Sequence, residues 1–170
     1  MPIFVLHVKA ELEGVAAFWA PDETTWTIDV KQGAGSDVRK DVVIDADEEQ
    51  EVPETKNTTC NFMVKFEGER KFSYLKVLKP GDAGFPKNLQ LKKQTADDTG
   101  LVPIFACECR GMEPCGWTPI GPYCVETEGG TVYNEVGFRD GDDWCEYDEK
   151  SEESMTVGLD IQSEFRLHKK

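Results

Sequence analysis

The side chains best suited to chemistry in this sequence are its cysteines. Four of the six lie in one stretch of the second half, at Cys107, Cys109, Cys115 and Cys124. Thiolates are soft ligands that suit zinc or copper(I), and two neighbouring thiols can also act as a redox pair. Free cysteines also pack in cores as small apolar residues. All three interpretations stay open, and we favour packing for Cys107 and Cys109, which would share one strand face with Phe105.

Other catalytic chemistry finds little support in the sequence. His7 falls on the polar side of an alternating segment and His168 lies in the basic tail, without an obvious serine or cysteine partner. Neither the G-x-x-x-x-G-K-[ST] loop nor the G-x-G-x-x-G loop, which commonly bind phosphate groups, occurs in the chain. Arg110 is flanked by Glu108 and Glu113, so we expect an intramolecular ion pair there. We predict that the protein is not an enzyme.

The charge balance limits the expected partners. The 170 residues include 33 acidic and 19 basic side chains, which gives a net charge of −14. Nucleic acids and anionic membranes are also negative, so we expect neither as a partner and favour a basic protein instead. No signal peptide is visible, and no apolar run approaches the roughly 20 residues of a membrane helix. We therefore expect a cytoplasmic protein with reduced thiols.

The elements that position these side chains are expected to be strands. Apolar and polar residues alternate along residues 4–12, 25–30 and 62–66. The longest such segment is 155–167, which we expect to present one apolar face broken only by Ser163. Glycines and prolines interrupt these segments at short intervals, so the connections are short. The pattern predicts an all-β fold with antiparallel pairing.

A weak internal repeat indicates two related halves. The pattern E-x-x-G, an apolar residue and then W-x-P occurs at residues 11–21 and again at residues 108–119. Chance recurrence in a β-rich sequence is the alternative explanation. We predict two related antiparallel β lobes that form one compact unit, with residues 1–96 in the first lobe and 97–170 in the second.

Two acidic segments are expected to be solvated surface. Residues 45–54 contain six acids and no base, and residues 140–153 contain eight acids and one base, Lys150. The second segment also contains Trp144 and Tyr147, so part of it should pack against the core.

The second half resembles a known family. Residues 106–119, 126–136 and 142–154 are similar to the eukaryotic CXXC-motif-containing zinc-binding proteins, with a looser match in the first half. The matching positions are Glu108, Cys109, Arg110, Gly111, Glu113, Pro114, Gly130, Thr131, Asp143, Trp144, Tyr147, Asp148, Glu149, Lys150, Glu153 and Ser154. The resemblance implies an all-β protein of two related halves and carries over no catalytic activity.

The resemblance also implies a zinc site whose ligands this sequence lacks. Members of the family hold one zinc ion with two C-x-x-C pairs, and four thiolates form a closed tetrahedral site. This chain contains no C-x-x-C. Matching its strands to the family puts Gln32 and Gly35 at the first pair and Phe66 and Glu69 at the second, and these residues cannot replace four thiolates. We predict that zinc is absent and that no other cofactor is bound.

Without a metal, the two hairpin tips at residues 31–36 and 66–69 need other means of closure. The glycines of both tips are expected to supply the positive φ that tight turns require, namely Gly33, Gly35 and Gly68. Packing of Phe66 and Phe72 should contribute as well.

The sequence therefore predicts a non-catalytic binding or assembly protein. Two alternatives stay open. The first is a metal-handling protein, for zinc or copper, whose site has moved to Cys107, Cys109, Cys115 and Cys124. The second is a thiol redox protein.

Overall fold

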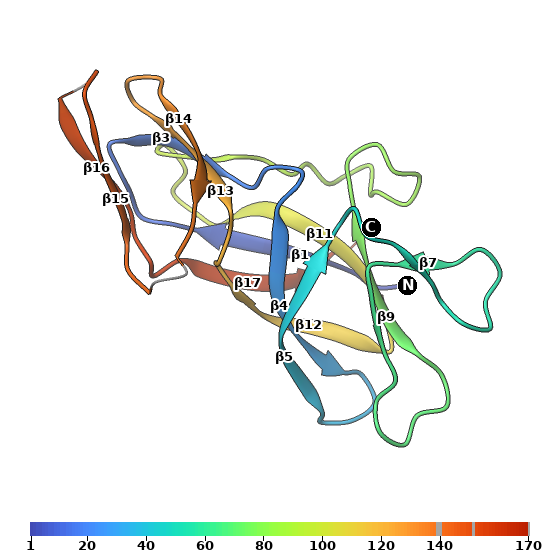
Figure 1. The fold of residues 1–170 in the computed structure, drawn as a ribbon. Helices are drawn as coiled ribbons and strands as arrows, with labels where there is room; N and C mark the ends of the chain where they lie inside the picture. The colour runs from blue at the N-terminus through green and yellow to red at the C-terminus, as the bar shows by residue number, and fades with distance from the viewer. Residues whose placement is uncertain (139–140, 151, 170) are drawn as a thin grey trace.

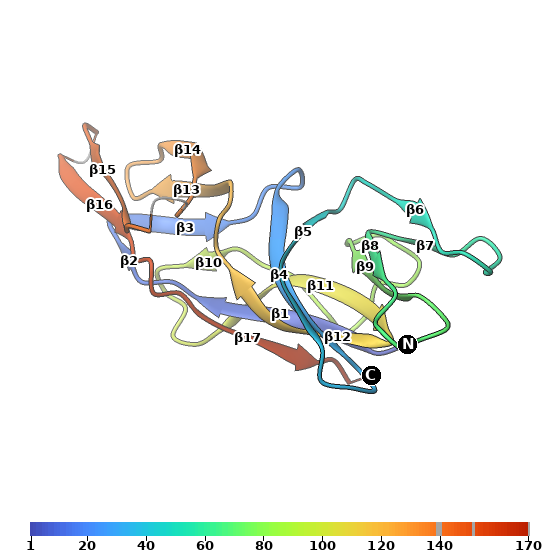
Figure 2. The ribbon, with the colours of Figure 1, turned by 60° about the horizontal axis from the view of Figure 1, so that its bottom comes forward.

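The computed structural model describes residues 1–138, 141–150 and 152–169, and within these ranges the chain forms strands and no helix. Every strand pair in the described residues is antiparallel. The predicted all-β, antiparallel fold is confirmed. The molecule is elongated, with β15 and β16 at one end and β6 and β7 at the other (Figures 1 and 2).

The largest sheet has five strands in the order β17-β1-β11-β9-β8. Their bounds are Gln162–Leu167 for β17, Ile3–Lys9 for β1, Val102–Arg110 for β11, Ser73–Leu78 for β9 and Phe62–Val64 for β8. The strands β1 and β11 are central and pair from Ile3 opposite Glu108 to Val8 opposite Val102. Because β17 covers the other edge of β1, the two ends of the chain lie near each other (Figure 2).

Two further sheets each combine strands from both halves of the sequence. One has the order β10-β3-β13-β14, with β10 at Gln94–Thr95, β3 at Val15–Trp19, β13 at Tyr123–Thr127 and β14 at Val132–Val136. The other has the order β12-β4-β5, with β12 at Met112–Thr118, β4 at Thr25–Gln32 and β5 at Val38–Asp45. Each of these two sheets pairs strands that precede residue 96 with strands that follow it. The division into a first lobe 1–96 and a second lobe 97–170 therefore stays a prediction.

Two small sheets occupy the ends of the molecule. The first has the order β15-β16-β2, with β15 at Trp144–Asp148, β16 at Glu153–Val157 and β2 at Leu12–Glu13. The second pairs β6 at Gln50–Glu51 with β7 at Thr59–Cys60.

The segment 155–167 does not present one apolar face, because it is divided between two strands of different sheets, so that prediction is wrong. Residues 155–157 end β16, and the chain then crosses to the central sheet as β17. Gly158 donates its backbone N–H to the Glu11 carbonyl (2.9 Å), and this contact marks the bend between the two sheets. The alternation therefore extends over two strands that bury their apolar side chains in different places.

Each repeated E-x-x-G motif ends in a glycine with positive φ. Gly14 has a φ of 69° and precedes β3, and Gly111 has a φ of 76° and precedes β12. A Cβ atom on Gly111 would lie 2.3 Å from the Ser73 hydroxyl, so a larger residue would also clash there. Both motifs thus make a sharp turn from one sheet into another.

The interior contains two main apolar clusters. One includes Leu6, Ile28, Leu75 and Phe105, and the other includes Phe18, Tyr123, Val125, Met155 and Val157. Ala20, Trp117 and Ile161 pack against both clusters and join them. Trp117 also donates its indole N–H to the Tyr123 hydroxyl (3.2 Å). The two clusters therefore belong to one continuous body.

Candidate functional site

The four positions matched to the family's zinc ligands come from two chain segments that meet in space. Gln32 ends β4, at the start of the hairpin turn that leads into β5. Glu69 lies in the connection between β8 and β9, where its backbone N–H donates to the Phe66 carbonyl (3.0 Å). The Gln32 amide Nε2 donates to Glu69 Oε1 at 2.5 Å. A side-chain hydrogen bond therefore links the two tips.

The remaining two positions support this contact. A Cβ atom on Gly35 would lie 2.5 Å from Gln32 Oε1, so glycine leaves the space that the Gln32 amide fills. Phe66 is buried, and the Arg39 guanidinium lies over its ring, 5.9 Å from the centroid. Sequence reasoning missed Arg39. A cation in an edge strand and an aromatic residue at a nearby hairpin tip are a pattern that could have indicated this cation–π contact.

The donor groups at these positions do not fit structural zinc. Zinc in such sites takes thiolates and imidazoles, whereas Gly35 and Phe66 offer no side-chain ligand atom at all. The carboxylate of Glu69 already accepts the Gln32 amide. These tips thus carry a direct amide–carboxylate bond where the resemblance implies a metal.

The role predicted for two of the tip glycines is wrong. Gly68 has a φ of 84°, as expected for a tight turn, but neither Gly33 nor Gly35 lies in the left-handed region. The turn after β4 is wide, and the Gln32 N–H donates to the Asp37 carbonyl across it (2.8 Å). Gly33 is needed for a close approach instead, because its N–H donates to the Gly111 carbonyl (2.9 Å) and a Cβ would lie 3.3 Å from that peptide.

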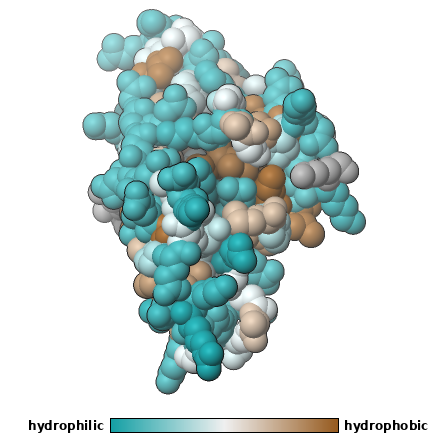
Figure 3. Space-filling view, turned by 90° about the vertical axis from the view of Figure 1, so that its right-hand side faces the viewer, coloured by the Kyte–Doolittle hydropathy of each residue, from teal (hydrophilic) through white to brown (hydrophobic). Residues whose placement is uncertain are grey.

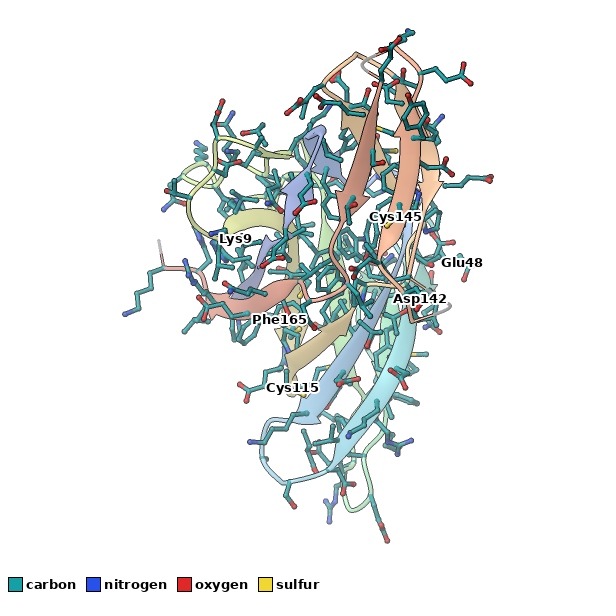
Figure 4. The ribbon with its side chains drawn as sticks, turned by 90° about the vertical axis from the view of Figure 1, so that its left-hand side faces the viewer. Lys9, Glu48, Cys115, Asp142, Cys145 and Phe165 are labelled. Atoms are coloured by element: carbon teal, nitrogen blue, oxygen red, sulfur yellow. The ribbon has the colours of Figure 1, made fainter. Side chains whose placement is uncertain are left out.

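The cysteines do not gather into one cluster. Cys107 and Cys109 are buried with Phe105 in one apolar cluster, with their sulfur atoms 4.0 Å apart. Cys115 is exposed on β12, and Cys124 on β13 contacts the Asn134 side chain. Figure 4 separates Cys115 clearly from Cys145, the other exposed thiol. Within the described residues, no three His, Cys, Asp or Glu side chains are arranged to hold a metal ion.

Burial also shapes the chemistry of these thiols. Desolvation raises the pKa of Cys107 well above its ordinary value, and it raises the pKa values of Cys60, Cys115 and Cys124 as well. The neighbouring carboxylates of Asp29 and Glu113 add to the effect at Cys115. A raised pKa keeps a thiol protonated at neutral pH and lowers its reactivity as a nucleophile.

The two histidines contact a backbone carbonyl and an amide side chain. His7 is half-buried, and desolvation lowers its pKa even though its ring contacts the Val5 carbonyl (3.2 Å). The His168 ring contacts the Asn88 side chain (2.8 Å). Neither contact joins a histidine to a serine or cysteine.

The family-motif residues are divided between the interior and the surface of the molecule. Asp148 is buried, accepts the Thr127 hydroxyl (3.1 Å) and caps the β15–β16 turn by accepting the Lys150 N–H (3.2 Å). Trp144 packs edge-on against Tyr133, with ring centroids 5.3 Å apart. Glu149 is exposed in the same turn. Cys109 is buried, and Glu113 and Pro114 lie on β12.

Arg110 does not form the predicted ion pair. It is exposed at the end of β11, and the ion pairs between described residues do not include it. The chain turns at Gly111 into a different sheet, which carries Glu113 away from β11. Glu108 lies on the same strand face as Arg110, but no ion pair joins them. The cation is therefore free to face the surface.

An acidic surface surrounds exposed apolar side chains at one end of the molecule, and we call this region the acidic end. Tyr147 on β15 is 55% exposed and Val132 on β14 is 46% exposed. The exposed acids of these strands and turns are Glu128, Glu135, Asp142, Asp143, Glu146, Glu149, Glu152 and Glu153. Asp140, the first acid of the predicted acidic segment 140–153, lies outside the described residues. The Tyr133–Trp144 contact holds β14 beside β15 (Figure 1).

Known proteins give an independent comparison. A curated bovine protein named "CXXC motif containing zinc binding protein" is 35% identical over 69 residues, which cover 39% of this chain and 42% of the bovine one. The Drosophila melanogaster protein "UPF0587 protein CG4646" is 38% identical over 78 residues, which cover 45% and 47% of the two chains. The chain thus spans less than half the length of the curated relatives it matches.

Two solved structures share the fold over almost the whole chain. A hypothetical protein from Plasmodium falciparum has a TM-score of 0.80 and 25% identity, with 98% of this chain and 100% of that chain covered. The structure of C1orf123 has a TM-score of 0.81 at 22% identity, with coverage of 98% and 99%. The described part of the chain contains no helix that could cross a membrane.

The family comparison agrees with the motif positions found in the sequence. The family model described as "CXXC motif containing zinc binding protein, eukaryotic" matches residues 5–166. The match covers both tips, most of the central sheet and the hairpin of β15 and β16. This chain therefore belongs to the eukaryotic family of CXXC motif containing zinc binding proteins.

Proposed function

We propose that this chain is a non-catalytic binding or assembly protein whose partner is a basic protein. The observation that carries the proposal is the acidic end, where exposed Tyr147 and Val132 lie among exposed carboxylates that form no ion pair with a described residue. An apolar anchor within a ring of one charge favours a partner of opposite charge, because the anchor supplies affinity and the charges supply orientation. The net charge of −14 argues against nucleic acid or an anionic membrane as that partner.

The partner surface can be tested with a matched pair of triple variants. In Glu146→Gln/Tyr147→Ala/Glu149→Gln, two charges and the anchor are removed from the acidic end. The control Glu67→Gln/Asp97→Asn/Val43→Ala removes two exposed acids and one exposed apolar side chain elsewhere. We expect affinity purification from the source cells to recover one basic protein in stoichiometric amount with wild type and control, and at least tenfold less with the first variant. Equal recovery with both variants, or no stoichiometric partner, would contradict the proposal.

We further propose that this member of the family works without zinc. Relatives carry zinc in their name. Here the Gln32–Glu69 bond and the Arg39–Phe66 contact supply a link between the tips that needs no metal. The expected result is less than about 0.1 zinc per chain by elemental analysis of the purified protein. EDTA should leave the melting temperature unchanged, because removal of a structural zinc commonly unfolds its domain.

The contact between Cys107 and Cys109 supports one alternative, a metal-handling protein with zinc or copper bound by thiolates. Elemental analysis separates this alternative from our proposal. About one metal per chain, lost in Cys107→Ser or Cys109→Ser, would favour it. The raised pKa of Cys107 favours neither metal capture nor thiol exchange, because both reactions need the thiolate. Six free cysteines agree with a reducing, cytoplasmic location for the protein.

A further inference from the structure

A cavity of about 300 Å³ opens beside Arg110, on the far side of the molecule from the acidic end. Its walls come from the β6–β7 connection, the β8–β9 connection and the end of β11. The lining side chains include four cations, Lys65, Arg70, Lys71 and Arg110. Figure 3 shows the right-hand side of the molecule as drawn in Figure 1, where apolar residues are exposed between hydrophilic ones. Nothing in the sequence motifs predicts this convergence, because the cations come from segments about 40 residues apart in the chain.

These cations lack the partners that cations on an acidic protein usually find. Of the described residues, none forms an ion pair with any of the four. Glu54 is the one carboxylate among the lining residues. The Glu69 carboxylate in the neighbouring loop accepts a hydrogen bond from Gln32. Four cations against one carboxylate around one hollow repel one another, so an anion bound among them would be electrostatically stabilised.

The lining also specifies the kind of anion. Two guanidinium groups offer paired N–H donors that match phosphate oxygens, and two ammonium groups add point charges. Phe72 and Tyr74 line the same cavity, and Lys65 lies over the Phe72 ring, 5.3 Å from its centroid. The volume equals that of about ten water molecules, which exceeds one phosphate group and falls at the lower limit of small-ligand pockets.

We propose that this cavity binds a small phosphate monoester, with the phosphate held by Arg70 and Arg110 and the organic group packed against Phe72. A small ligand is favoured over a polyanion because the net charge of −14 on the whole chain repels a long anion that extends beyond the cavity. A small anion inside the cavity feels mainly the nearby cations, since salt screens charges more than about 10 Å away. The site is separate from the acidic end and does not rest on the function proposed above.

Titration of the isotopically labelled full chain by NMR tests the site, with phenyl phosphate as the probe. We expect shifts concentrated at residues 53–55, 65–72 and 110, and affinity at least tenfold tighter than for inorganic phosphate or for phenol alone. In Arg70→Gln/Arg110→Gln, the affinity should fall at least tenfold. In Lys40→Gln/Lys87→Gln, which removes the same charge outside the cavity, it should fall less than twofold. Arg70 and Arg110 are exposed, so the melting temperature should not change.

Four outcomes would overturn the proposal. Scattered shifts, or equal weakening in the two double variants, would show a general response to charge. Phenol binding as tightly as phenyl phosphate would show that the phosphate group does not contribute to the affinity. Inorganic phosphate binding as tightly as the ester would overturn the assignment to an ester.

Discussion

The side chain of Gln94 takes the place of a strand neighbour for Ala10, between β1 and β2. It is buried, its amide donates to the Ala10 carbonyl (2.7 Å), and its own carbonyl accepts the Ala10 N–H (2.8 Å). Gln94→Leu would leave both backbone groups buried without partners. We expect the free energy of unfolding in urea to fall by about 3 kcal/mol, from two unsatisfied groups. The matched change Gln90→Leu at an exposed position should alter it by less than about 0.5 kcal/mol.

The Gln32–Glu69 bond between the tips can be broken without touching either partner. In Gly35→Ala, the new Cβ would lie 2.5 Å from Gln32 Oε1 and push the amide away from Glu69. The free energy of unfolding should fall by about 1.5–3 kcal/mol, the value of a hydrogen bond to a charged group. Gly100→Ala is the control, because its Cβ meets no atom within 4 Å and its φ is not positive. Equal stability of the two variants would argue against the bond as a clamp.

The thiols differ in exposure, and this gives a prediction about labelling. With iodoacetamide at neutral pH, the native protein should be alkylated at Cys115 and Cys145, the two exposed cysteines. Cys107 should stay unlabelled until the protein is denatured, because burial raises its pKa and blocks access. Mass spectrometry of tryptic peptides measures each site. Rapid labelling of Cys107 in the native state would support the thiol redox alternative instead.

Single residues were predictable where a strand face decided their environment. Alternation alone was enough to place Cys107 and Cys109 inside with Phe105. It could not predict the exposure of Arg110, which depends on the turn at Gly111. The conformations of Gly33 and Gly35 were also out of reach, because they depend on the width of the turn and on which distant backbone approaches it.

At the scale of elements, the short strand β10 is fixed by a charged turn. Asp98 pairs with Lys92 (2.6 Å) and accepts the Thr95 N–H (2.7 Å), and these contacts, that with Lys92 above all, lower the pKa of Asp98. The stabilisation is therefore present above the ordinary carboxyl pKa and is lost as the pH falls through the lowered value.

This sign gives a test by substitution. Asp98→Asn should lower the free energy of unfolding at pH 7 by about 1 kcal/mol, a modest value because Lys92 is 42% exposed. The difference from wild type should shrink as the pH is lowered from 7 to 3, measured by urea unfolding at each pH. Asp97→Asn, its exposed neighbour, should show no such trend.

Strand existence was readable from the sequence, but strand continuity and partners were not. The alternation in residues 155–167 does not reveal that the chain passes from β16 in one sheet to β17 in another. Apolar residues repeat at every second position in both strands, so the pattern looks unbroken. The two tips were located correctly as neighbours only through the family resemblance. Their contact needs β4 and the β8–β9 connection to approach in space, and local pattern does not encode this approach.

At the scale of the whole molecule, the two apolar clusters should unfold together. Ala20, Trp117 and Ile161 contact both clusters, and two sheets pair strands from either side of residue 96. We expect one urea transition, with tryptophan fluorescence and far-UV circular dichroism coinciding. Fragments 1–96 and 97–170 should each stay unfolded when expressed alone. A folded fragment, or two separate transitions, would instead support two independent lobes.

The pairing of β1 has a consequence for how the protein is made. The partners of this first strand are β11 and β17, which leave the ribosome much later. Until then, β1 has two open edges and the apolar side chains Val5, Leu6 and Val8 without cover. The nascent chain therefore exposes apolar side chains and unpaired strand edges until β11 and β17 are synthesised. Binding by a chaperone during synthesis would protect it from aggregation.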